Sequence, residues 1–257
     1  MEISEHIDAL RLHGTAMADA AERAGLDAPV PSCQPWLVKD LLRHTGFIHR
    51  WAARHITERP ATVLDGPTEE EILKSDPADP ELATWFLAGH AALVEVLSAA
   101  DPALECATFM AAPCPLAFWA RRQAHETAMH RADAESAAGA LPEYPADFAA
   151  DGIDELIMGF GRRAKYRPAT DADGGRLRVV SADTADAWSI DAHDGRMQPR
   201  REEGDDPAGA TCTVTGPASG VYLFLWHRAD AARADVTVTG NPDLLESWQS
   251  SVRVRWG

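Results

Sequence analysis

The sequence has few cysteines and no excess of basic residues, and each shortage excludes a class of protein. Its four cysteines show neither the spacing of a metal-binding motif nor the pattern of a disulfide-rich secreted domain. We therefore expect free thiols and a cytoplasmic location. The formal net charge of −16 argues against nucleic acid or an anionic membrane surface as a partner.

An export signal and a long apolar run are also lacking. The segment Met1–His6 has no basic residues followed by an apolar core, so we expect no signal peptide. We expect no membrane-spanning segment either, because no window looks sufficiently apolar. A Gly-rich phosphate loop, a Gly-x-Ser-x-Gly elbow and the paired carboxylates of a glycosidase are not evident. We expect small molecules as partners and a monomer as the working form.

Apolar residues recur with helical spacing in the N-terminal half of the chain. This spacing, together with the positions of Pro and Gly, predicts four helices: one over residues 2–24, one from about residue 35, one from residues 79–80, and one that contains residues 118–135. Loops are expected at residues 25–35, 60–77 and 101–115. Four amphipathic helices of about 20 residues predict a four-helix bundle over residues 1–150.

The pattern changes near Ala150, where the apolar period falls from 3.6 to 2. It predicts a short helix at 148–160, strands at 176–180, 187–191, 211–215 and 235–239, a helix at 218–231, and a last helix from Asn241-Pro242. Residues 151–257 are therefore expected to form a small α+β domain. The predicted fold class is a two-domain α+β protein.

The stretch from Phe118 to Glu135 carries the strongest chemical signal. It has no Gly or Pro and is rich in Ala, Arg and Glu, which predicts a helix. One face of that helix carries Leu116, Trp119, Gln123, Glu126, His130, Ala134 and Ala137. Glu126 and His130 lie at i and i+4, so both can reach one metal ion, although a surface Glu–His pair is the alternative. His125 points away, so this is not the zincin His-Glu-x-x-His motif.

A histidine also interrupts the apolar face of the second predicted helix. His44 shares that face with leucines and an isoleucine, and with Glu126 and His130 it forms a set of two histidines and one carboxylate. Three protein ligands leave a fourth position open, as in catalytic zinc sites. Iron(II) and nickel accept the same ligands. A core histidine without a metal is the alternative for His44, and His49 and His55 are fallback ligands.

Polar residues close to the ligand set have two interpretations each. Asp133 follows His130 by three residues and could accept a hydrogen bond from its imidazole, or it could be exposed and paired with Arg122 or Arg131. Arg121, Arg122 and Arg131 could bind a substrate carboxylate, or they could be solvated on the outer face of the helix. In the second half, the helix that contains Arg228 combines aromatic and basic residues, and its alternative is a core Trp beside a surface Arg.

Several motifs resemble the mycothiol-dependent maleylpyruvate isomerase family. In the N-terminal half these are Asp40-Leu-Leu-Arg-His44 with Trp51 downstream, and Arg121-Arg-Gln-Ala-His-Glu-Thr-Ala-Met-His-Arg-Ala-Asp133. In the C-terminal half they are Asp151-Gly-Ile-Asp-Glu155, a strand around Trp188, Leu225-Trp-His-Arg228 and the run from Val236 to Leu245. The resemblance covers nearly the whole chain. The family's common Leu-Trp-Gly-Arg stands here with His227 in place of the glycine.

The resemblance implies a DinB-like metal-binding bundle followed by a sterol-carrier-like domain. It also implies zinc on His44, Glu126 and His130. Independently of the resemblance, the position of Asp133 makes it a candidate for supporting a ligand, and Arg131 and Arg228 are candidates for binding substrate or thiol. The cosubstrate would be mycothiol, in an actinobacterial cytoplasm. A metal-bound thiolate would then add to a cis-enoyl acid, a single bond would rotate, and elimination would release the trans isomer.

Three other functions fit the same sequence. A mycothiol S-transferase acting on an electrophilic metabolite would use the same ligands and release the sulfur adduct. A carrier would hold an apolar ligand in the C-terminal domain and use the metal structurally. A metal-binding regulator, of the kind that sequesters a sigma factor, would present an exposed apolar face. The family's motifs do not separate these possibilities or identify the substrate.

Overall fold

The structure is a computed structural model that describes residues 1–163, 174–194, 196–202 and 209–254. The chain forms two compact units, Met1–Pro142 and Glu143–Gly257. The first unit is helical, and the second combines helices with a mixed sheet. The predicted α+β fold class is therefore confirmed.

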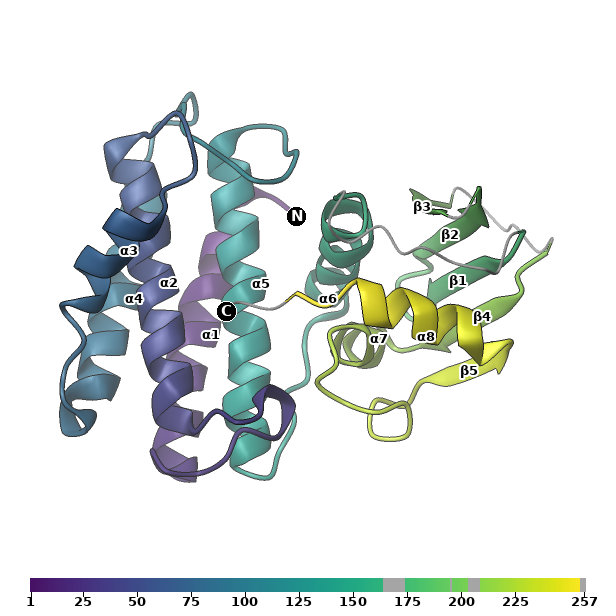
Figure 1. Ribbon diagram of the computed structural model, residues 1–257, viewed down its shortest axis with the longest axis horizontal. Coiled ribbons are helices and arrows are strands. Elements are labelled where there is room, and N and C mark those ends of the chain that lie inside the picture. Colours follow the sequence, from purple (N-terminus) through teal and green to yellow (C-terminus); the bar gives the residue numbers. More distant parts are fainter. Residues whose placement is uncertain (164–173, 195, 203–208, 255–257) are drawn as a thin grey trace. The chain divides into compact units, whose positions relative to one another are not determined.

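Four long helices build the first unit and run side by side (Figure 1). They are α1 (Ile3–Ala24), α2 (Val38–Glu58), α4 (Leu82–Ala99) and α5 (Pro115–Ala137). Helix α1 packs mainly against α5, and α2 packs mainly against α4. Met17, Leu41 and Phe86 meet in the shared apolar core. The predicted four-helix bundle is thus present, and its inner faces carry the stripes read from the sequence.

A fifth helix, α3 (Gly66–Leu73), lies where a loop was predicted. Glycine and proline were taken as breakers at residues 66 and 67, but here they occupy the first helical turn. The carbonyl of Asp65 accepts hydrogen bonds from the backbone of Thr68 and Glu69. Glu71 in turn binds Arg54 of α2, with 2.8 Å between Nη1 and Oε2. Helix α4 is preceded by a 3₁₀ turn at Asp79–Glu81.

Helix α4 corrects the expectation that no segment is apolar enough to span a membrane. By length and composition alone, residues Asp79–Ala99 pass that test. The reason is that α4 is apolar on both sides, with Phe86 and Leu93 buried and Leu87 exposed. Because α4 packs against α1 and α2 in the bundle, this is weak evidence for a membrane span.

A groove lies between α1 and α4, with a volume of about 730 Å³. Its polar lining comes from Arg11 and Thr15 of α1 and from His90 and Glu95 of α4. None of the three predicted metal ligands lines it. The groove is therefore separate from the candidate site described below.

The second unit begins with α6 (Ala146–Asp154) and a π-helical turn at Glu155–Phe160. Its sheet has the order β3-β2-β1-β4-β5. The strands are β1 (Arg176–Ser181), β2 (Ala187–His193), β3 (Arg196–Arg201), β4 (Cys212–Gly216) and β5 (Thr237–Gly240). Strand β1 pairs in parallel with β4, and the other pairs are antiparallel.

Four of these strands were predicted, and β3 was not. Its sequence is charged and contains Pro199, which argues against a strand in the interior of a sheet. Strand β3 lies at the edge and pairs only with β2 among the described residues. Proline is tolerated there because an edge strand leaves one row of backbone groups outside the ladder.

Helix α7 (Ala218–Leu225) is shorter than the predicted 218–231. It ends in a Schellman motif, in which the amide of His227 bonds to the carbonyl of Phe224 and the amide of Arg228 bonds to that of Leu223. His227 has a φ of 62°, a left-handed conformation that favours glycine. This explains why the Leu-Trp-Gly-Arg pattern has a glycine at the position that His227 occupies here. The last helix, α8 (Pro242–Ser251), begins after the cap Asn241 as predicted.

Candidate metal site

The three predicted ligands meet inside the bundle. His44 comes from α2, and Glu126 and His130 come from successive turns of α5. The Oε1 of Glu126 lies 3.2 Å from Nε2 of His130 and 3.6 Å from Nε2 of His44. One ligand atom from each side chain falls within 4.8 Å of the other two. This is a donor set of two imidazoles and one carboxylate, of the kind that binds zinc, iron or nickel.

The three candidate ligands are largely shielded from solvent, and this burial affects the pKa values of Glu126 and His44. Burial raises the pKa of Glu126, but the neighbouring imidazoles of His130 and His44 and the charge of Arg122 outweigh it, so this pKa lies well below its usual value. Burial lowers the pKa of His44. The carboxylate is therefore ionised and His44 is neutral at neutral pH, and these are the forms that bind a cation.

Asp133 fixes the orientation of His130. The Nδ1 of His130 lies 2.8 Å from Oδ2 of Asp133, so Nδ1 carries the proton and Nε2 faces Glu126. The Oγ of Ser32 donates to Oδ1 of the same carboxylate, and the thiol of Cys33 donates to Oδ2 at 3.4 Å. Asp133 has no exposed surface, so the alternative of a solvent-exposed aspartate is wrong. A carboxylate behind a histidine is a common arrangement in metal sites.

We expect Asp133→Asn to weaken metal binding by about 10- to 100-fold, because an amide cannot hold the same imidazole tautomer as strongly. Competition with a chelating dye would measure this affinity. Ser32→Ala is the matched comparison and should have a smaller effect, since it removes one of the donors to Asp133 and leaves the contact with His130. Unchanged affinity in Asp133→Asn would show that this contact has no part in metal binding.

Cys33 reaches the site through its contact with Asp133, and none of the four cysteines, all of which the structure describes, forms a disulfide. It belongs to the loop before α2, which also places Trp36 beside the ligands. The ring of Trp36 lies 4.9 Å from that of His44 and 6.4 Å from that of His130, between centroids. The site thus has an aromatic wall on this side. Sequence patterns gave no reason to select either residue, because their position depends on the path of the loop.

Arg122 had two interpretations, binding a substrate carboxylate or lying solvated on the outer face of its helix. Only 1% of its surface is exposed, so the solvated alternative is wrong. Its Nη2 lies 2.8 Å from Oε2 of Glu126, one helical turn away. The spacing i, i+4 between an arginine and a glutamate was the available signal.

The fallback ligands lie elsewhere. His49 Nε2 lies 2.9 Å from the hydroxyl of Thr127. His55 contacts the carbonyl of Trp51 through Nδ1 and accepts from the amide of Leu64 through Nε2. Both histidines are therefore engaged in the bundle core rather than with Glu126.

Two arginines were considered for substrate or thiol binding. Arg131 contacts Oε1 of Glu135 at 2.7 Å and Nδ1 of His13 at 3.2 Å, so both of these contacts hold it within the bundle. Arg228 lies in the second unit, where its Nη1 donates to the carbonyl of Trp226 at 2.7 Å. Their roles in binding remain predictions.

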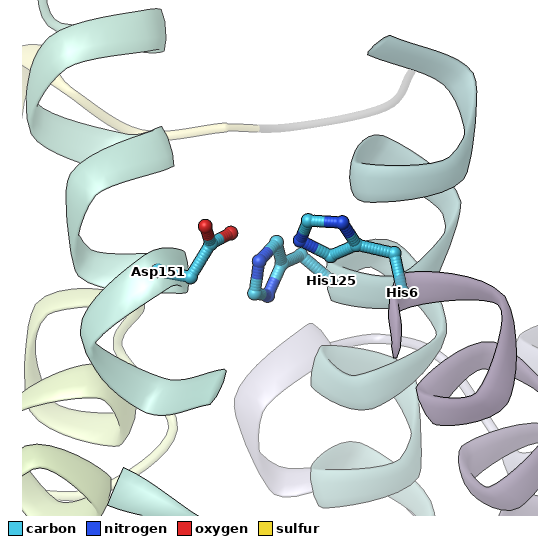
Figure 2. Close-up of side chains that lie close together, drawn as sticks. All are labelled: His6, His125 and Asp151. Carbon is cyan, nitrogen blue, oxygen red and sulfur yellow. The ribbon is translucent and has the colours of Figure 1, made fainter. Parts of the chain in front are cut away.

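His125 faces away from the candidate metal site, as the helical count predicted. Its ring lies against that of His6 from α1, with 6.0 Å between centroids and 72° between planes. Figure 2 shows these two imidazoles close together, one from α5 and one from α1. His125 is thus not available as a base beside Glu126.

Comparison with known proteins agrees with the resemblance seen in the sequence. The family described as "Mycothiol maleylpyruvate isomerase N-terminal domain" matches residues 8–135, which include all three candidate ligands. Among curated proteins, none matches the chain significantly.

Two solved structures share the fold of the whole chain. One is the mycothiol-dependent maleylpyruvate isomerase, with a TM-score of 0.63, and the other is a histidine-to-alanine variant of it, with a TM-score of 0.65. Both are 14% identical in sequence, and each alignment covers 93% of this chain and 93% of the other. At this identity the likeness shows the fold alone.

Proposed function

Because the chain belongs through residues 8–135 to the mycothiol maleylpyruvate isomerase N-terminal domain family, we propose that it is a metal- and mycothiol-dependent enzyme. Its reaction would be the cis–trans isomerisation of an enoyl acid. The observation that carries the proposal is the buried set of His44, Glu126 and His130, whose ligand atoms converge. We further propose that it works in the cytoplasm as a monomer on small molecules.

The donor set fits a divalent ion, with zinc as the first candidate. Two imidazoles and one ionised carboxylate provide three ligands, and His130 is already oriented by Asp133. Although burial lowers it, the pKa of His130 is raised by Asp133 and Glu126, so binding of an ion would release a proton from this imidazole. Such an ion leaves a coordination position open and lowers the pKa of a thiol that occupies it. A merely structural site would supply a fourth protein ligand, and none belongs to the cluster among the described residues.

The residues around the set favour a thiol rather than water as the reactant. Hydrolysis by activated water usually recruits a carboxylate or histidine as base. Glu126 is occupied by Arg122 and two imidazoles, and His125 faces His6 instead. A thiol needs no further base after its proton has passed to the solvent. The thiol sulfur would add to one alkene carbon, the resulting single bond would rotate, and loss of the same sulfur would release the trans acid.

The arginines are candidates for holding the carboxylate of the enoyl acid. One candidate is Arg228, whose Nη1 donates to the backbone carbonyl of Trp226. Arg131 is the other candidate, and its contacts to Glu135 and His13 would have to be exchanged for the substrate. Arginine suits the role because its planar group matches a carboxylate with two hydrogen bonds.

The test is turnover of cis-enoyl acids by the metal-loaded protein with and without mycothiol. We expect turnover only with the thiol, and the thiol should be recovered unchanged. Glu126→Gln should lose bound metal and turnover in parallel, since the neutral amide is a poorer ligand than the carboxylate.

Three outcomes of this assay would contradict the proposal. Turnover that is indifferent to mycothiol would exclude the thiol as cosubstrate. Accumulation of a sulfur adduct would indicate an S-transferase instead of an isomerase. A Glu126→Gln protein that keeps its metal but is inactive would show that Glu126 acts as a base and not as a ligand.

A further inference from the structure

We propose that Arg122 is a positioning residue that makes the metal site select an anionic fourth ligand, such as a thiolate, over a neutral one. The inference rests on the proposed function, because it takes a divalent ion at His44, Glu126 and His130 as given. Arg122 acts through Glu126 and does not itself touch the thiol or the substrate.

The first observation is that Arg122 is held in place inside the bundle. Only 1% of its surface and 3% of that of Glu126 is exposed, and 2.8 Å separates Nη2 from Oε2. A buried guanidinium is costly unless a carboxylate compensates it. The two residues lie one turn apart on α5, so the pair is fixed by the helix itself.

The second observation is that the two oxygens of Glu126 are divided between two tasks. Oε2 accepts from Arg122, whereas Oε1 faces Nε2 of both His44 and His130. Arg122 therefore keeps one carboxylate oxygen away from the ion. Glu126 is then limited to one donor atom, and the position that a second oxygen would take stays available to an external ligand.

The third observation concerns charge. Arg122 places a positive charge beside Glu126 in a part of the bundle that is shielded from water. A thiolate at the fourth position brings in a negative charge as its proton leaves to the buffer, and the guanidinium stabilises that charge. Removal of Arg122 removes this stabilisation where the dielectric constant is low, which makes the thiolate less favourable. The affinity for a neutral ligand such as imidazole should depend little on this charge.

Loss of Arg122 should thus change two affinities in opposite directions. The ion should bind more tightly, because Glu126 no longer shares its charge with a guanidinium. The thiolate should bind more weakly, by about 10- to 100-fold for one unit charge at an effective dielectric constant near 20. A purely structural role for Arg122 predicts that both affinities fall together as the bundle loosens.

The experiment uses cobalt(II) as the ion, 2-mercaptoethanol as the thiol and imidazole as the neutral ligand. Sulfur-to-cobalt charge-transfer absorption reports thiolate binding, and competition with a chelating dye reports cobalt affinity. In Arg122→Gln we expect tighter cobalt binding, thiolate binding weaker by about 10- to 100-fold, and imidazole binding within about twofold of the wild type. Arg122→Lys keeps the charge and should retain most of the thiolate affinity. It also replaces Arg122→Gln as the test if the glutamine variant does not fold.

Arg50→Gln is the matched control, because Arg50 is also partly buried but binds the carbonyls of Gly46 and Trp85 instead of a ligand. It should leave all three affinities unchanged. The inference is wrong if Arg122→Gln binds thiolate as the wild type does, or if thiolate and imidazole weaken equally. If Arg122→Gln does not fold, weak thiolate binding in Arg122→Lys would overturn it. Failure of the wild type to bind cobalt or thiol would instead refute the proposed function.

Discussion

His130→Ala and His44→Ala should each purify without a stoichiometric divalent ion, whereas the wild-type protein should hold one ion per chain. Each substitution removes one of three protein ligands whose atoms lie within 4.8 Å of one another. Loss of one ligand leaves an incomplete set that cannot retain a divalent ion through purification. Metal analysis of the purified proteins measures this directly. Turnover should fall with the metal content in both variants.

His49→Ala is the matched control for these two variants. His49 lies on the same helix as His44, is buried whereas His44 is partly buried, and contacts Thr127 rather than Glu126. It should keep the ion even though it loses packing in the core. Full metal content in His44→Ala or His130→Ala would refute the assignment of ligands, and loss of metal only in His49→Ala would move the site to the fallback ligand.

Acid should destabilise the metal-free protein steeply below pH 6.5, because several histidines are buried in their neutral form. Burial, the charge of Arg131 and that of His125 lower the pKa of His13 to about 3. Burial lowers the pKa of His49 well below its usual value and that of His90 below it. Below about pH 6.5 the unfolded chain takes up these protons and the folded chain does not. The free energy of unfolding therefore decreases as the pH is lowered.

Each such histidine lowers the free energy of unfolding by about 1.4 kcal/mol per pH unit below 6.5, until its folded pKa is reached. For His13 alone the loss at pH 4 is about 3 kcal/mol. His130 has a raised pKa in the folded protein, so its contribution to the free energy of unfolding changes only above pH 6.5. It therefore does not mask the loss of stability below pH 6.5. Urea denaturation of the metal-free protein between pH 7 and pH 4 would give the slope.

His13→Gln should flatten this slope, because glutamine does not titrate and can still accept the hydrogen bond from Arg131. The difference from the wild type should approach the contribution of one histidine. An identical slope in the two proteins would mean that His13 is protonated in the folded state, which its contact with Arg131 disfavours.

The convergence of the three candidate ligands could be predicted from the sequence because local geometry determines most of their arrangement. Glu126 and His130 share a helical face at i and i+4, and that relation holds in any helix. His44 was identifiable because a polar side chain interrupts an apolar stripe, and buried stripes of a bundle face one another. Its distance to Glu126 still depended on how α2 and α5 pack, which periodicity does not give.

The surroundings of the ligands could not be predicted in the same way. Ser32 and Cys33 reach the site from a 3₁₀ turn at Pro31–Cys33, and Trp36 reaches it from the residues between that turn and α2. The path of this segment depends on tertiary contacts rather than on a repeating pattern. The burial of Arg122 was not predicted because a charged side chain is usually solvated, and the buried carboxylate of Glu126 reverses that preference.

The elements that were missed have a similar explanation. Helix α3 begins with Gly66-Pro67, a pair that breaks a helix in its interior but is compatible with its first turn. Strand β3 is charged and contains Pro199, and it forms because an edge position needs only one partner. Helix α7 ends early because His227 adopts the left-handed conformation of a helix terminus.

The measurement that tests the central claim most directly is X-ray absorption at the metal edge, before and after mycothiol is added. We predict one ion per chain bound by two imidazole nitrogens and one carboxylate oxygen, with one sulfur joining the coordination sphere when the thiol is present. An ion that gains no sulfur at saturating mycothiol, or a protein that binds no stoichiometric ion, would contradict the account.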